Sequence, residues 1–319
     1  MKALPRDLQS TYERLFCKSD SPEDLRTFLH WAALSARPIT LEELAEAIAV
    51  NFQSENSPCY DADCRYMDPR DALTVCSGLV TTFEGTIRSS NSVYSRTNRG
   101  ENSGIIKLAH MSVKDYLLSE HIAKGPARYF SLNAKIAHSV ITENCLAYLL
   151  HFGTLDSLSG AAVISFPLAR YAAEHWSLHM RLCENTSPSE SLQKLLSHLF
   201  LTTSDAHANW MWLIHTRPRW DWLMPPLSRI WKPAEKRRLS EDISTPLYVA
   251  ALLGQHALVQ ELLVQANSLT SDRRWYNKAL QGAAYEGHNE VVERLLHHAP
   301  RLRMQVDRYG GAAIIVAAS

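Results

Sequence analysis

One stretch of the chain occurs twice, and this duplication limits the possible folds more than any other feature. The first copy is Thr245–His256 and the second is Ala279–His288. Each copy contains an Ala-Ala pair, a glycine and a histidine, and Gly254 and Gly287 lie 33 residues apart. A period of this size predicts helical hairpins that bury their apolar faces against one another.

The duplicated skeleton resembles ankyrin repeats. Its small residues, such as Ala250 and Ala283, suit close contacts between neighbouring units, and a glycine suits the left-handed turn after the first helix. A third copy begins at Asp307 and is truncated at Ser319. We therefore expect ankyrin repeats over residues 244–319, forming a short α-solenoid joined by an irregular segment between the two clear copies, Val264–Asn277.

Ankyrin repeats imply protein recognition through a rigid concave face and finger-like turns. We expect the contacts to come from the short turns and inner helices, with two aromatic residues on a finger. The candidate protein-binding residues are Leu253, Gln255, Trp275, Tyr276, Tyr285 and Glu286.

Composition favours a mainly α, cytoplasmic protein. The 319 residues contain only 12 glycines, and the 33 basic residues balance the 33 acidic ones, so the chain has no general attraction to nucleic acid or anionic membranes. No apolar run has the length of a signal peptide or a membrane span. The six cysteines form no tight framework, which predicts reduced thiols.

The first 120 residues predict helices interrupted by a small β-hairpin. Thr40 and Glu43 form a capping box that opens one helix, and Ser21 and Ser112 are expected to cap two others. The predicted helices are Leu4–Lys18, a helix from Ser21, Leu41–Val50, Pro69–Cys76 and a last helix through Ser119; the strands are Leu79–Phe83 and Ile105–His110. Asn51–Asp68 reads as a loop. This order is the winged-helix arrangement.

Several segments of this region resemble the winged helix that follows the NACHT NTPase domain in NACHT–ankyrin proteins of filamentous fungi, which are relatives of NOD-like receptors. The segments are Leu4–Leu8, Arg37–Leu44, Cys76–Val80 and Leu108–Leu117. The resemblance implies a post-NACHT winged-helix domain at residues 1–123.

Residues 124–240 resemble the helical connector of the same family, through Pro167–Trp176 and His179. The end of this segment is rich in tryptophan, from Trp210 to Trp231. Such a cluster could form a binding hot spot, but a core role is favoured.

No motif predicts catalysis. The chain has no phosphate-binding G-x4-G-K-[ST] loop and no G-x-S-x-G turn. In the family, the NTPase domain would precede Leu4, so the resemblance does not carry nucleotide hydrolysis to this chain. We expect no enzymatic activity and no cofactor.

Metal and acid–base chemistry are weakly supported. Cys59 and Cys64 have roughly metal-ligand spacing but no second pair, and His175 and His179 lie on one helix face without a third ligand. We expect no metal site. His110 has no neighbouring nucleophile in the sequence pattern and is expected to be structural.

DNA binding is also weakly supported. The helix predicted at Leu41–Val50 carries only acidic charges, and the supporting basic residues are Arg88, Arg96 and Arg99 of the predicted wing. We therefore do not expect nucleic acid as a partner.

The sequence leads to a non-enzymatic interaction scaffold, the sensor and recognition part of a NOD-like-receptor-like signalling protein, which binds a protein partner through ankyrin repeats. The alternative is a regulatory winged helix acting on a NACHT NTPase in the same or a separate chain. A DNA-binding winged helix is the third possibility.

Overall fold

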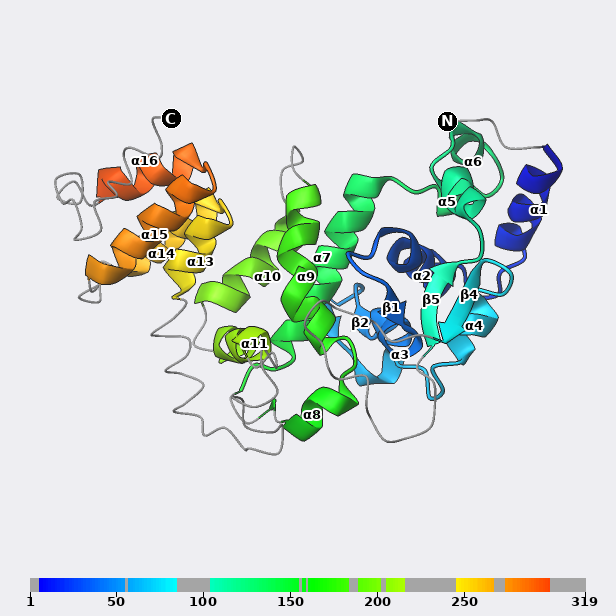
Figure 1. Ribbon diagram of the computed structural model, residues 1–319, viewed down its shortest axis with the longest axis horizontal. Coiled ribbons are helices and arrows are strands. Elements are labelled where there is room, and N and C mark those ends of the chain that lie inside the picture. The colour runs from blue at the N-terminus through cyan, green and yellow to red at the C-terminus, as the bar shows by residue number, and fades with distance from the viewer. Residues whose placement is uncertain are drawn as a thin grey trace. The chain divides into compact units, whose positions relative to one another are not determined.

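The computed structural model describes residues 6–54, 57–84, 104–154, 157–158, 160–183, 189–201, 205–215, 245–266 and 273–298. The chain divides into two compact units, the first comprising Met1–Leu195 and Leu213–Ile230 and the second Leu196–Trp212 and Trp231–Ser319. The first unit holds a small sheet among helices, and the second is helical in its described part (Figure 1).

The first unit begins with two helices, α1 (Arg6–Cys17) and α2 (Pro22–Leu34). Its main sheet is antiparallel, with strand order β1-β5-β4, and Ile39 pairs with Ile106. The strands are β1 (Ile39–Thr40), β4 (Val80–Glu84) and β5 (Gly104–Leu108). The two strands predicted from the sequence are therefore present, each within one or two residues of its predicted bounds.

The region between β1 and β4 differs from its prediction. The helix expected at Leu41–Val50 is α3 (Leu41–Ala45), followed by the 3-10 turn η1 (Glu46–Ile48). A second, two-stranded sheet then forms from β2 (Val50–Asn51) and β3 (Cys59–Tyr60). The 3-10 turn η2 (Ala62–Cys64) and the helix α4 (Asp71–Val75) complete the region.

The observed helix N-caps agree only in part with those predicted from the sequence. Thr40 and Glu43 form the predicted capping box, with both reciprocal hydrogen bonds present. Ser21 is the N-cap residue of α2, as predicted, but its side chain makes no cap bond. The cap of α5 (Met111–Leu117) is the side chain of His110, which accepts the N–H of Ser112, and the predicted cap at Ser112 is wrong.

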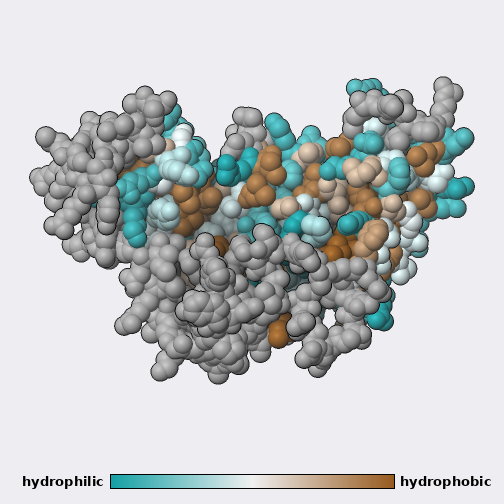
Figure 2. Space-filling view, viewed as in Figure 1, coloured by the Kyte–Doolittle hydropathy of each residue, from teal (hydrophilic) through white to brown (hydrophobic). Residues whose placement is uncertain are grey.

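The rest of the first unit is built on two long helices that pack side by side, α7 (Ala134–Leu150) and α9 (Ala169–Leu182). α7 also packs on α2 and β3, so it joins the connector region to the N-terminal sheet region. The shorter elements are α6 (Glu120–Lys124), which packs on α5 and η3 (Arg128–Phe130), and α8 (Gly160–Ser165). Apolar residues are scattered among hydrophilic ones on the visible face of this unit (Figure 2).

Two helices, α10 (Glu190–Leu201) and α11 (Ala206–His215), cross the unit boundaries. Trp210 and Trp212 of α11 are buried, which confirms the core role for these two. Trp220, Trp222 and Trp231 lie outside the described residues.

The two sequence copies form two helical hairpins in the second unit. The first is α13 (Pro246–Leu252) with α14 (His256–Ala266), and the second is α15 (Arg273–Tyr285) with α16 (Asn289–His298). The segment predicted to be irregular between them, Val264–Asn277, instead contains the end of α14 and the start of α15.

The prediction of a mainly α chain with a small β-hairpin is confirmed. In the part of the chain that the structure describes, the hairpins do not extend into a repeat solenoid, so this finer prediction is not shown. Among the described residues, no helix is long and apolar enough to cross a membrane.

Candidate functional site

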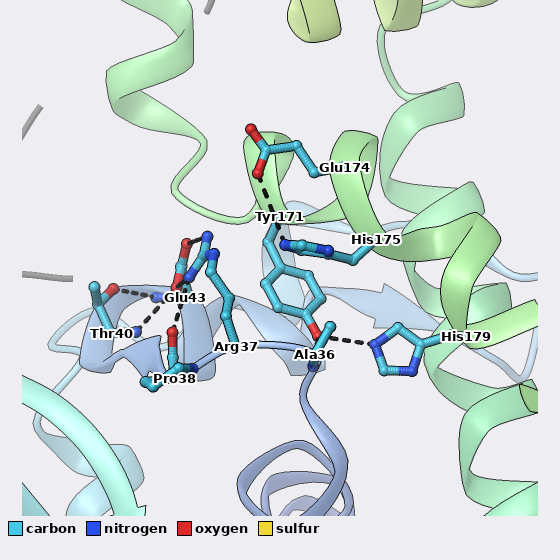
Figure 3. A network of polar contacts seen from close by, with 9 residues as sticks. All are labelled: Ala36, Arg37, Pro38, Thr40, Glu43, Tyr171, Glu174, His175 and His179. Atoms are coloured by element: carbon cyan, nitrogen blue, oxygen red, sulfur yellow. Dashed lines mark hydrogen bonds and ion pairs between the residues drawn. The ribbon is translucent and has the colours of Figure 1, made fainter. Parts of the chain in front are cut away.

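In the described part of the first unit, a network of buried polar contacts centres on Tyr171 of α9 (Figure 3). Its side chain is fully buried. Its hydroxyl oxygen accepts the backbone N–H of Ala36 at 2.8 Å and lies 2.8 Å from Nε2 of His179. Residues 171 and 179 are eight apart on one helix, which places both on one face. The hydroxyl therefore ties α9 to the segment that joins α2 to β1.

The contact continues from α9 to α7. Nδ1 of His179 lies 2.8 Å from Nδ1 of His138, and His179 is fully buried. A neutral chain satisfies these contacts when Tyr171 donates to His179 and the Nδ1–H of His179 donates to His138. We refer to Ala36, Tyr171, His179 and His138 as the Tyr171 network.

The surroundings keep the Tyr171 network uncharged. Burial, followed by the charges of His138 and His175, lowers the pKa of His179 from 6.5 to about 3. Burial and then Lys114 lower the pKa of His138, and burial raises the pKa of Tyr171. Both imidazoles and the phenol are therefore neutral at pH 7.

A charged cluster lies against the same tyrosine ring. The guanidinium of Arg37 donates to both carboxylate oxygens of Glu43, at 2.9 and 2.6 Å, and lies 5.0 Å from the centre of the Tyr171 ring. Glu43 also accepts the N–H of Thr40 at 2.9 Å as half of the capping box. Burial alone would lower the pKa of Arg37, but the hydrogen bond and charge of Glu43 raise it. Arg37 is therefore fixed as a cation over Tyr171.

A second buried acid joins α7 to η1. The carboxylate of Glu46 accepts Nε–H of Arg65 at 2.5 Å and the hydroxyl of Tyr148 at 2.6 Å. Asn144, one turn before Tyr148, donates to the backbone carbonyl of Ala47 at 2.5 Å. Like Tyr171, these side chains connect the connector helices to the N-terminal region.

Chemically, the Tyr171 network is a structural joint. Tyr171 and His179 have no exposed surface, so no substrate atom can reach their polar groups in this conformation. Both ring nitrogens of His179 face protein partners, and burial opposes adding a proton to either imidazole. The arrangement can hold three segments in fixed register, and it offers no accessible base or nucleophile.

His175 and His179 lie on one face of α9 but have different partners. His179 bonds Tyr171 and His138, whereas Nε2 of His175 lies 3.7 Å from Glu174. The missed signal was the stripe of Tyr171, His175 and His179 at intervals of four, which places a tyrosine beside the histidines. Among the described residues, no group of three or more potential metal ligands occurs.

His110 has a neighbour that the sequence pattern did not reveal. Its Nδ1 lies 2.7 Å from Oγ of Ser112, which lies 2.7 Å from the hydroxyl of Tyr12. The same Nδ1 accepts the N–H of Ser112 at 3.1 Å. Since Ser112 is buried, this chain serves as the cap of α5 and its link to α1.

The residues predicted to bind a protein partner are divided between surface and core. Tyr285 is 80% exposed and Glu286 is exposed, whereas Leu253 and Gln255 are half-buried. The finger placement of Trp275 and Tyr276 is wrong, because both lie in α15. The helix α15 begins six residues before the second sequence copy and so includes both residues. Tyr276 is buried, and its ring stacks on His298.

Two of the acidic side chains that were evidence against DNA binding form buried ion pairs within the protein. Glu43 and Glu46 are buried and paired with Arg37 and Arg65. The wing residues Arg88, Arg96 and Arg99 lie outside the described part of the chain.

Comparison with curated proteins found a relative that matches most of the chain. A curated relative, the "azaphilone pigments biosynthesis cluster protein L" of Monascus ruber, is 30% identical over 309 residues, which cover 93% of this chain. The chain spans 60% of that relative's length. No family model matches the chain, and no solved structure matches it.

This similarity corrects the family prediction. The assignment to fungal NACHT–ankyrin proteins related to NOD-like receptors is wrong, because the relative that spans nearly the whole chain is a protein of a pigment biosynthesis cluster. The predicted role as the sensor of a signalling protein, with its two alternatives, is wrong for the same reason. The short motifs that suggested the family describe local packing: Arg37–Leu44 forms β1 and α3, and Leu108–Leu117 contains the His110 cap.

Replacing Tyr171 with phenylalanine tests the joint. Tyr171→Phe leaves Nε2 of the buried His179 without its partner and removes the acceptor of the Ala36 N–H. A buried unpaired polar group costs about 1–3 kcal/mol. We expect the free energy of unfolding, measured in urea, to fall by about that amount. Tyr129→Phe at an exposed ring is the matched control. Equal effects of the two substitutions would contradict the role given to Tyr171.

Acid should destabilise the first unit before its carboxylates titrate. The folded pKa values of His30, about 4, and His179, about 3, lie below the ordinary 6.5, so the unfolded chain binds protons first. The contribution of these two neutral histidines to the free energy of unfolding is fully present above pH 6.5. It is lost as the pH drops towards their folded pKa values, by at most about 1.4 kcal/mol per pH unit for each histidine.

Urea unfolding between pH 7 and 5 measures this loss. His179→Asn should weaken the pH dependence, while His121→Asn at an exposed site should leave it unchanged. An unchanged pH dependence in His179→Asn would show that this histidine is not held neutral by folding.

Proposed function

We propose that this chain is a non-enzymatic accessory part of a fungal pigment biosynthesis cluster protein. The similarity to the Monascus ruber cluster protein over 93% of the chain carries this proposal. The role proposed is to support pigment formation through contact with another protein, without carrying out a chemical step itself.

The polar chemistry of the first unit supports a non-enzymatic role. In its described part, the buried polar groups around Tyr171 and Glu46 are directed at other parts of the chain. Balanced charge supports a protein rather than a nucleic acid as the partner, because phosphate binding requires accumulated positive charge.

We further propose finer fold assignments. The order α1, α2, β1, α3, α4, β4, β5 with sheet order β1-β5-β4 supports a winged-helix arrangement within residues 1–123. The two hairpins spaced by 33 residues support ankyrin-like units within residues 244–319. Residues 124–240 would then be the connector. The contacts of Tyr171 with Ala36 and of Tyr148 with Glu46 argue that the first two parts fold together.

Genetic replacement in Monascus ruber tests the function. The gene of the relative is deleted, and a chimera in which this chain replaces the matching part of the relative is introduced, because the chain spans only 60% of that protein. We expect deletion to lower all pigments together and the chimera to restore them, as measured by chromatography of culture extracts.

Two outcomes would contradict this proposal. Unchanged pigment after deletion would refute a role in pigment formation. Accumulation of one intermediate would show a missing chemical step, and thus an enzyme. A chimera with Tyr171→Phe that remains folded should retain pigment formation, because Tyr171 is assigned no chemical step.

A further inference from the structure

A pocket lies on one face of α6 in the first unit, beside α5, which packs on both α1 and α6 (Figure 1). It has a volume of about 350 Å³ and is lined by Glu120, His121, Lys124 and Gly125. Residues 120 and 124, like 121 and 125, are four positions apart, which places them on the same side of the helix and its C-terminal end. The volume is within the range of small-molecule sites.

Glu13 of α1 brings a carboxylate to this pocket. A Cβ added at Gly125 would lie 2.9 Å from Oε1 of Glu13, so the carboxylate lies against the glycine that lines the pocket. The side chain of Glu13 is half-buried, and it forms no hydrogen bond or ion pair with another described residue. Glu120, by contrast, is paired with Lys124 at 2.9 Å. The charge of Glu13 is therefore the one available to a ligand.

The hydroxyl of Tyr116 adds a buried polar atom beside the pocket. Tyr116 of α5 is fully buried, and its hydroxyl makes no hydrogen bond within the described part of the chain. The centre of its ring lies 6.1 Å from that of His121, which lines the pocket. Burial, followed by the charge of Glu13, raises the pKa of Tyr116 to about 12, so the phenol is neutral. Buried hydroxyls without a partner are uncommon in folded proteins, and a bound group that supplies the partner accounts for this one.

The chemistry of these groups selects the ligand. A carboxylate accepts N–H donors and neutralises a positive charge, and the phenol oxygen supplies a second acceptor. Lys124 is held by Glu120, which disfavours an anionic ligand. We propose that the pocket binds the primary ammonium group of a small organic amine, between the carboxylate of Glu13 and the hydroxyl of Tyr116. This binding involves no chemical step and does not rest on the proposed role in pigment formation.

Titration of the full chain with n-butylammonium chloride tests the site, with the amide chemical shifts of residues 120–125 as the measurement. We expect saturable shifts with a dissociation constant on the order of millimolar, because the probe has few atoms with which to make contacts. n-Butanol has a similar shape without the charge, and butyrate has the opposite charge. Neither should produce saturable shifts in this segment.

Two substitutions separate binding from folding. Glu13→Gln should weaken n-butylammonium binding about tenfold or more, because a charge-assisted hydrogen bond is lost. Tyr116→Phe should weaken it about fivefold, the equivalent of one neutral hydrogen bond. The urea midpoint of Tyr116→Phe should not fall, because the hydroxyl has no protein partner to lose. Glu23→Gln, at an exposed site on α2, is the control and should change neither measurement.

Three results would overturn the proposal. The absence of saturable shifts with n-butylammonium would show that the pocket does not bind an amine. Equal shifts with n-butanol or butyrate would show that the ammonium group is not recognised. Unchanged binding in Glu13→Gln, or a lowered urea midpoint with unchanged binding in Tyr116→Phe, would show that these side chains do not hold the ligand.

Discussion

The hydroxyl of Tyr171 is the contact on which the arrangement of the first unit most depends. It accepts a backbone N–H from the segment before β1 and contacts a histidine on its own helix, which contacts a second histidine on α7. Three segments far apart in sequence therefore meet in one buried chain of polar atoms. Because Tyr171 and His179 are fully buried, their polar atoms depend on each other and on Ala36 and His138 for hydrogen bonds, and these contacts fix the register of the helices.

The charged residues around this chain extend the same principle. Glu43 joins the cap of α3 to Arg37, and Arg37 covers the ring of Tyr171. Glu46, three residues later, holds Arg65 and Tyr148. Two carboxylates on neighbouring turns thus connect the N-terminal region with α9 and α7. Their cost of burial is offset by paired hydrogen bonds, which is the condition under which buried charges are tolerated.

Local features of this fold could be predicted from the sequence, whereas contacts between distant segments could not. The capping box at Thr40, the paired strands β4 and β5 and the duplicated hairpins follow from short-range patterns. The early end of α3 could not be predicted from such patterns, because the next residue, Glu46, turns inward to bond Arg65 and Tyr148, which are 19 and 102 residues away. The Tyr171 stripe on α9 was visible, but its partners Ala36 and His138 belong to other elements. The family resemblance failed because its short motifs encode local packing, while similarity over the whole chain leads to a pigment cluster protein.

The central claim is that the Tyr171 network is a neutral structural joint rather than a reactive site. Nitrogen-detected NMR of the histidine rings measures this most directly, because it reports both the protonation state and the tautomer. Our account predicts that His179 remains neutral with its proton on Nδ1 down to about pH 4, in keeping with its pKa of about 3. Titration of His179 near the ordinary value of 6.5 would contradict it.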